Sequence, residues 1–133
     1  MWHQLAKNPE AVRDVFREET PSLEGVTLQK VAYVFNEYTD VLLTVNLPNY
    51  PRNPPGKWAD REYNTVQVTL RLVGVLSTGL TVFGPSERIN IKIDDKQNYL
   101  MLQATSDIVN FSVKFKWLYI SAVTGMQQAT TAA

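Results

Sequence analysis

The chain has 133 residues, the size of one domain, and 44% of them are hydrophobic while 20% are charged. This balance excludes disorder for the bulk of the chain and allows roughly two-thirds of the unfolded surface to be buried. Lys and Arg total 13 and Asp and Glu total 13, so the formal net charge is zero. A neutral chain lacks the long-range field that nucleic-acid or anionic-membrane binding normally uses, and we expect neither as a partner.

The sequence shows no cysteine, signal peptide or membrane span, and these features bear on the compartment and the domain organisation that we expect. Cysteine is absent, which excludes disulfides and zinc–thiolate sites and fits a reducing compartment. The N-terminal residues do not resemble a signal peptide, and no window approaches the roughly 20 apolar residues of a membrane span. We expect a cytoplasmic protein with a single globular domain over residues 1–125 and a frayed tail over residues 126–133.

One helix is predicted near the N-terminus. Asn8 suits the cap position, Pro9 suits the first helical position, and an apolar stripe at helical spacing follows. The helix should end at Thr20-Pro21, because a residue before proline is pushed out of helical geometry. Trp2 and Leu5 should attach this segment to the body of the domain.

After the helix, apolar residues alternate with period two, which predicts strands. The parity changes near Gln29-Lys30, which indicates a bulge or a bend. It changes again after Trp117, which we place on the buried face of a long strand that bends there. The fold class is therefore α+β and β-rich, with one N-terminal helix followed by seven or eight antiparallel strands in a sandwich or a strongly bent sheet. The predicted strands lie within residues 26–35, 41–47, 66–72, 80–83, 89–93, 99–105 and 109–122.

The connection between the second and third strands is the most distinctive segment. Four of the seven prolines lie in it, and their fixed φ angles predict a stiff, extended loop. It also gathers the residue types that are enriched at binding hot spots. The alternative for Trp58, which we favour, is a lid packed over the open end of the sheet. The candidate partner-binding residues are Tyr50, Arg52, Lys57, Trp58, Arg61 and Tyr63.

No pattern indicates catalysis, a metal or a cofactor. His3 is the one histidine and lies ahead of the helix, where we expect a solvated or loosely packed side chain. Asp94-Asp95 has the spacing of a hairpin turn and not of a metal site. A glycosidase-like carboxylate pair would need opposed positions across a cleft, which nothing in the sequence indicates. We therefore expect a protein that is not an enzyme, with no cofactor and no metal.

Several short segments, in this order, resemble the bacterial Immunity protein 50 family. The resemblance runs from residue 2 to about Val75, and its most specific parts are PSLEGV (Pro21–Val26) and the PPGKW segment followed by NTVQVTL. The other matching residues are Trp2, Leu5, Asn8 to Ala11, Phe16, Leu47 and Pro48.

The resemblance implies a small cytoplasmic protein that neutralises a cognate bacterial polymorphic toxin by stoichiometric binding. It carries no known contact or catalytic residues to this chain, and the oligomeric state stays open. An acidic patch that imitates nucleic acid would require Glu18, Glu19, Glu24, Glu37 and Asp40 to gather on the surface. The alternative function is a small β-sheet module that binds a carbohydrate or peptide through Tyr50, Trp58 and Tyr63, and a third possibility is a small hydrolase.

Overall fold

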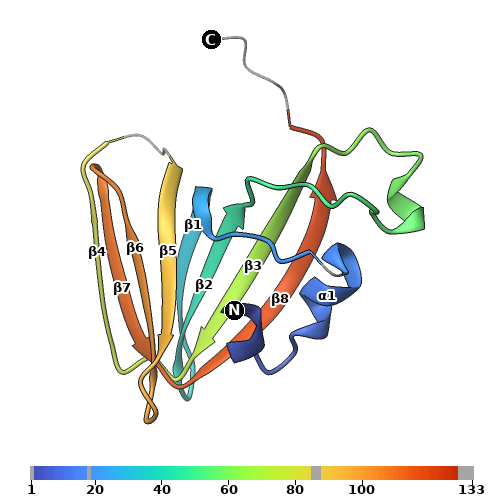
Figure 1. Cartoon of the computed structure of the whole chain (residues 1–133). Coiled ribbons are helices and arrows are strands. Elements are labelled where there is room, and N and C mark those ends of the chain that lie inside the picture. The colour runs from blue at the N-terminus through green and yellow to red at the C-terminus, as the bar shows by residue number, and fades with distance from the viewer. Residues whose placement is uncertain (1, 18, 85–87, 129–133) are drawn as a thin grey trace.

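The computed structural model describes residues 2–17, 19–84 and 88–128, and its dominant element is a single antiparallel sheet (Figure 1). The eight strands lie in the order β4-β7-β6-β5-β1-β2-β3-β8. This confirms the predicted β-rich α+β class and the strand count, with one sheet in place of two stacked ones. The strands are β1 (Glu24–Phe35), β2 (Thr39–Asn46), β3 (Thr65–Val73), β4 (Ser77–Val82), β5 (Arg88–Asp95), β6 (Leu100–Thr105), β7 (Val109–Phe115) and β8 (Trp117–Met126).

The core lies on one face of the sheet because successive side chains of a strand point to opposite faces. Burying one aliphatic or aromatic side chain of this kind stabilises the fold by about 1.5–3 kcal/mol. The alternating residues of β3 and β7 are at most 2% exposed and supply much of this core: Val66, Val68, Leu70, Leu72, Val109, Phe111, Val113 and Phe115.

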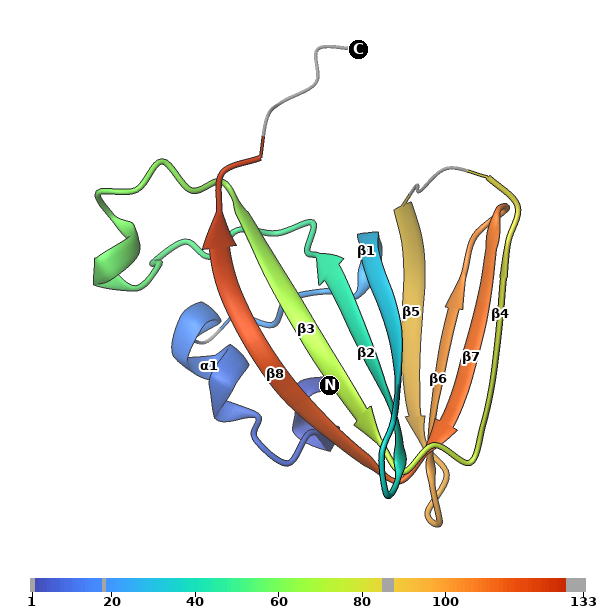
Figure 2. The ribbon, with the colours of Figure 1, turned by 180° about the vertical axis from the view of Figure 1, so that it is seen from behind.

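Strand β1 joins two groups of four strands. Its first residues pair with β5, whereas its residues from Thr27 to Phe35 pair with β2. The register shifts between Leu28 and Lys30, which confirms the predicted bulge. In Figures 1 and 2 the β4-β7-β6-β5 group and the β1-β2-β3-β8 group spread apart at the top and approach each other at the bottom.

The N-terminal segment closes the free edge of β8. A 3₁₀ helix, η1 (Trp2–Leu5), is followed by a parallel bridge between Ala6 and Leu118 and then by α1 (Glu10–Phe16). The predicted cap at Asn8 is wrong. The Asn8 amide donates to the Ile120 carbonyl at 2.8 Å and its Oδ1 accepts from the Ile120 amide at 2.8 Å, so this side chain pairs with the strand edge.

Two further expectations for this segment are corrected. The helix ends at Phe16 and not near Thr20, because Arg17 adopts a φ of 59° and leaves helical geometry. His3 is only 6% exposed, in edge-to-face contact with Trp2, and is therefore buried and not solvated. The expected attachment is confirmed: Trp2 and Leu5 pack against the core, and the Trp2 indole donates to the Pro21 carbonyl.

The C-terminal strand is not the continuation of a bent strand. β7 ends at Phe115 beside β4 and β6, and β8 begins at Trp117 beside β3 in the other group. The predicted burial of Trp117 is wrong, because this change of group turns its side chain outward, where it is 37% exposed.

The described part of the predicted tail remains attached to the fold. Met126 pairs with Thr65, and the Gln128 amide donates to Asn64 Oδ1 at 2.8 Å. Residues 129–133, which we expected to be frayed, lie outside the described residues, and the division at residue 125 stays a prediction. Among the described helices, none is long and apolar enough to cross a membrane.

Candidate protein-binding surfaces

The proline loop, residues 47–64, folds back on the sheet through a short helical turn. This turn, η2 (Gly56–Trp58), follows Pro55, whose carbonyl accepts from the Trp58 amide at 2.8 Å. The Arg61 amide then bonds to the Trp58 carbonyl at 3.0 Å. Since prolines restrict the approach and local hydrogen bonds hold the turn, the loop has a defined path.

Trp58 is the lid that the sequence favoured. It is 7% exposed and belongs to the core cluster. Its ring lies 5.8 Å from that of Tyr63 in an edge-to-face arrangement and 6.2 Å from that of Tyr50. Burial, and then the neighbouring Tyr63, raise the pKa of Tyr50. Trp58 is therefore part of the core, and both tyrosines pack against it and are partly buried.

The aromatic cluster sits close to β8. A Cβ at Gly125 would lie 2.5 Å from Tyr63 Cδ2 and 3.0 Å from Trp58 Cδ2. Because real Cβ atoms essentially never approach other heavy atoms this closely, β8 needs a glycine opposite the lid. The loop and β8 are thus fitted to each other, and Tyr50, Trp58 and Tyr63 form no exposed stacking platform.

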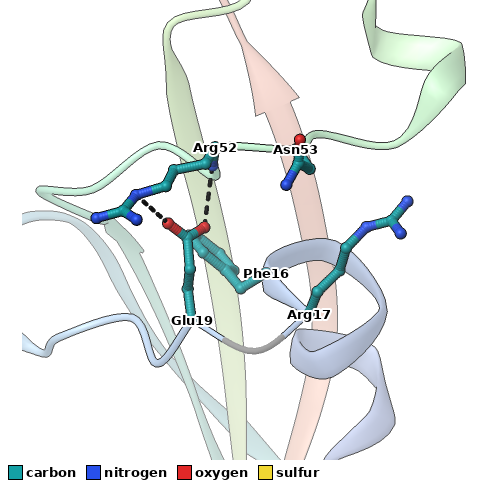
Figure 3. A pocket seen from close by; sticks show the side chains of 5 residues that line it. All are labelled: Phe16, Arg17, Glu19, Arg52 and Asn53. Carbon is teal, nitrogen blue, oxygen red and sulfur yellow. Dashed lines mark hydrogen bonds and ion pairs between the residues drawn. The ribbon is translucent and has the colours of Figure 1, made fainter.

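The remaining loop candidates are exposed cations. Lys57 and Arg61 are exposed, and the Arg52 side chain is 88% exposed. Arg52 Nε lies 3.2 Å from Glu19 Oε1, while its amide donates to Glu19 Oε2 at 2.9 Å, which ties the loop to the segment after α1 (Figure 3). An exposed ion pair of this kind contributes little stability.

A shallow surface hollow of about 520 Å³ lies between these two segments, lined by Phe16, Arg17, Glu19, Arg52 and Asn53 (Figure 3). Among the described residues that line it, Glu19 is the one carboxylate, and it already pairs with Arg52. The described lining of this hollow therefore contains no pair of carboxylates of the kind that a glycosidase-like reaction needs.

A second surface, which the sequence interpretation missed, is the face of the β1-β2-β3-β8 group that points away from the core. We call the outward side of residues 27–35 and of β2, β3 and β8 the open face. α1 packs on β8 through the buried residues Val12, Val15 and Phe16, and Figure 2 shows no helix over the opposite side of these strands. The signal was present in the sequence, because Trp117 and Tyr119 alternate with the buried Leu118 and Ile120.

Polar side chains make cross-strand contacts on the open face. Thr44 and Thr69 share a hydrogen bond of 3.1 Å between their hydroxyl groups, and the Gln67 amide donates to Asn46 Oδ1 at 3.0 Å. Each pair joins β2 to β3. These contacts hold the side chains of the face in place.

The central pair of the open face is Arg71 and Asp40. Arg71 Nε and Nη2 donate to Asp40 Oδ2 at 3.0 and 2.6 Å. The Asp40 side chain is 5% exposed, whereas that of Arg71 is 47% exposed. Asp40 Oδ1 is buried without a hydrogen-bond partner in the described part of the chain. Arg71 therefore covers a buried carboxylate and turns the rest of its guanidinium to solvent.

Aromatic side chains border this pair. Tyr119 is the direct cross-strand neighbour of Arg71 and is 40% exposed. Trp117 lies two residues before Tyr119 on the same face of β8. The Tyr38 ring packs edge-to-face against Trp117, with 6.1 Å between the ring centroids. A Cβ at Gly74 would come within 3.1 Å of Trp117 Cζ3, so Gly74 leaves room for this ring. The open face thus combines Arg, Tyr and Trp side chains on rigid strands.

The described acidic residues that a nucleic-acid mimic would require do not gather into a patch. Asp40 is buried, Glu19 is ion-paired to Arg52, and Glu24 and Glu37 lie near opposite ends of β1. Glu18 lies outside the described residues. Within the described residues, no group of three or more His, Asp or Glu side chains is placed to hold a metal ion.

A model of the Immunity protein 50 family matches residues 8–126 of the chain. The chain belongs to this family. The match begins ahead of α1 and ends with the last residue of β8, so it confirms the resemblance and extends it through the second half of the sheet. Comparisons with curated proteins and with solved structures found no match.

Proposed function

We propose that this Immunity protein 50 family member neutralises a cognate polymorphic toxin in the cytoplasm of the producing cell by binding it one-to-one, without catalysis. The observation that carries this proposal is the family match over residues 8–126, which spans every described strand of the sheet. An inhibitor of this kind needs a rigid surface complementary to its target, and preorganised interfaces can be very tight.

The proline loop remains a proposed contact region, but only three of its six candidate residues are still proposed as contacts. Its cations Arg52, Lys57 and Arg61 are exposed, so they can meet a partner at the rim of an interface, Arg52 from its ion pair with Glu19. The carbohydrate- or peptide-binding alternative loses its main support because Trp58 is buried and Tyr50 and Tyr63 pack against it.

The test is coexpression of the tagged chain with the product of the large open reading frame adjacent to its gene. We expect a one-to-one complex by native mass spectrometry and restored growth of cells that make the toxin. No complex together with no restored growth would contradict the proposal.

A titration separates binding from catalysis. If the chain acts by stoichiometric binding, the residual toxin activity should fall linearly and reach zero at an equimolar ratio. Loss of all toxin activity at a small fraction of one equivalent would instead indicate that the chain inactivates the toxin catalytically, which would refute the stoichiometric mechanism.

A further inference from the structure

The open face has an unusual charge distribution. Residues 27–35 of β1 together with β2, β3 and β8 contain only Lys30, Asp40 and Arg71 as charged residues. Lys30 pairs with Thr44 and so lies on the open face, where it is exposed. Since Asp40 is buried beneath Arg71, both charged groups that this face exposes are cations, and the three charges together leave one net positive charge. The face therefore complements a carboxylate.

Arg71 is held in position before any partner arrives. Both of its bonds to Asp40 go to Oδ2, and no hydrogen bond within the described residues uses its Nη1. Asp40 Oδ1 has no partner there either, so Arg71 cannot swing into solvent without leaving a buried carboxylate uncompensated. A guanidinium fixed in this way loses little side-chain entropy when it binds a second carboxylate.

The surroundings of Arg71 suit an apolar partner surface. Tyr119 and Trp117 expose ring surface beside it. A shallow hollow of about 400 Å³ adjoins Arg71 and Tyr119 and extends to Asn8 at the edge of β8. An ionic group flanked by exposed aromatic rings on a rigid support is the usual composition of a protein-binding hot spot.

We propose that the open face is the energetic centre of toxin binding, where Arg71 receives a toxin carboxylate whose apolar neighbours pack on Tyr119 and Trp117. This inference rests on the proposed function and names the surface that performs it. The loop cations then belong to the rim, because Arg52 is 88% exposed and rim charges influence association rate more than affinity.

The experiment measures the affinity of the full chain for the product of the adjacent open reading frame by calorimetry. The variants are Arg71→Lys, which keeps a cation over Asp40 but loses the planar fork, and Tyr119→Ser. The matched control is Phe83→Ser, which removes a 76% exposed ring next to β4, at the other edge of the sheet. Thermal melts establish that each variant is folded.

We expect each open-face variant to weaken binding about tenfold or more, as hot-spot residues do, while the control stays within about threefold of the wild type. One Asp or Glu→Ala variant of the toxin should weaken binding similarly, and its combination with Arg71→Lys should cause little further loss. Unchanged affinity of both folded open-face variants would overturn the inference and leave the proposed function intact. Failure of the wild-type chain to bind would instead refute the proposed function.

Sedimentation of the chain alone tests whether a second copy of the chain, and not a toxin, covers the open face. We expect the same mass for the wild type and Tyr119→Ser. A wild-type dimer that Tyr119→Ser dissociates would show that a second copy covers the open face, which would overturn the inference.

Discussion

Replacing Trp58 by alanine tests whether the proline loop is a structural lid or a contact surface. Trp58 is 7% exposed and packs against two further rings at 5.8 and 6.2 Å. Truncating a buried Phe or Trp costs about 3–5 kcal/mol, from lost burial and from the cavity that remains. For a domain of this size that loss lowers the melting temperature by roughly 10–20 °C.

The assay is urea unfolding of the free chain followed by circular dichroism, with Lys57→Ala as the matched control. Lys57 is adjacent in the same turn but exposed, so its variant should stay within about 0.5 kcal/mol of the wild type. A Trp58→Ala variant with wild-type stability that no longer bound the toxin would refute the lid and make Trp58 a contact residue.

Three further changes probe other parts of the structure. Gly125→Ala should destabilise the fold by about 1–3 kcal/mol, because its Cβ would meet Tyr63 at 2.5 Å. In a Tyr63→Ala background the same substitution should lose most of this destabilisation, as measured in a double-mutant unfolding cycle. Additive effects of the two substitutions would contradict the clash. Arg71→Ala should cost about 1–3 kcal/mol in urea unfolding because it leaves the buried Asp40 carboxylate unpaired, and unchanged stability would show that the ion pair is dispensable. Burial first, and then nearby positive charge that includes Arg13, lower the pKa of His3 below 6.5. Below about pH 6.5 the unfolded chain therefore binds a proton more readily than the folded chain, and the free energy of unfolding falls as the pH drops. His3→Gln should flatten this decrease in unfolding curves measured at several pH values.

Local patterns account for much of the architecture. Strict alternation in β3 and β7 determines which side chains are buried, since the side-chain period of a strand is two. The parity change at Gln29-Lys30 identified the bulge in β1. The prolines predicted the stiff loop, and the favoured placement of Trp58 as a lid agrees with the structure.

The errors arise where the outcome depends on distant partners. Asn8 has the local character of a helix cap, yet it bonds to Ile120, 112 residues along the chain. His3 has a polar side chain near the N-terminus, but η1 folds it inward. Trp117 continues the alternation of β7 in the sequence, although the chain leaves that group of strands at Lys116.

The sequence by itself determined that this chain is a β-rich domain with one N-terminal helix and a stiff proline loop, and its motifs placed it in its family. Only the tertiary structure decided that β8 pairs with β3, and this pairing brings Tyr119 beside Arg71. It also joined Arg71 to Asp40 across 31 residues and turned both aromatic residues of β8 outward. The reason is that alternation is a local property of a strand, whereas the neighbours of a strand are chosen by burial over the whole sheet.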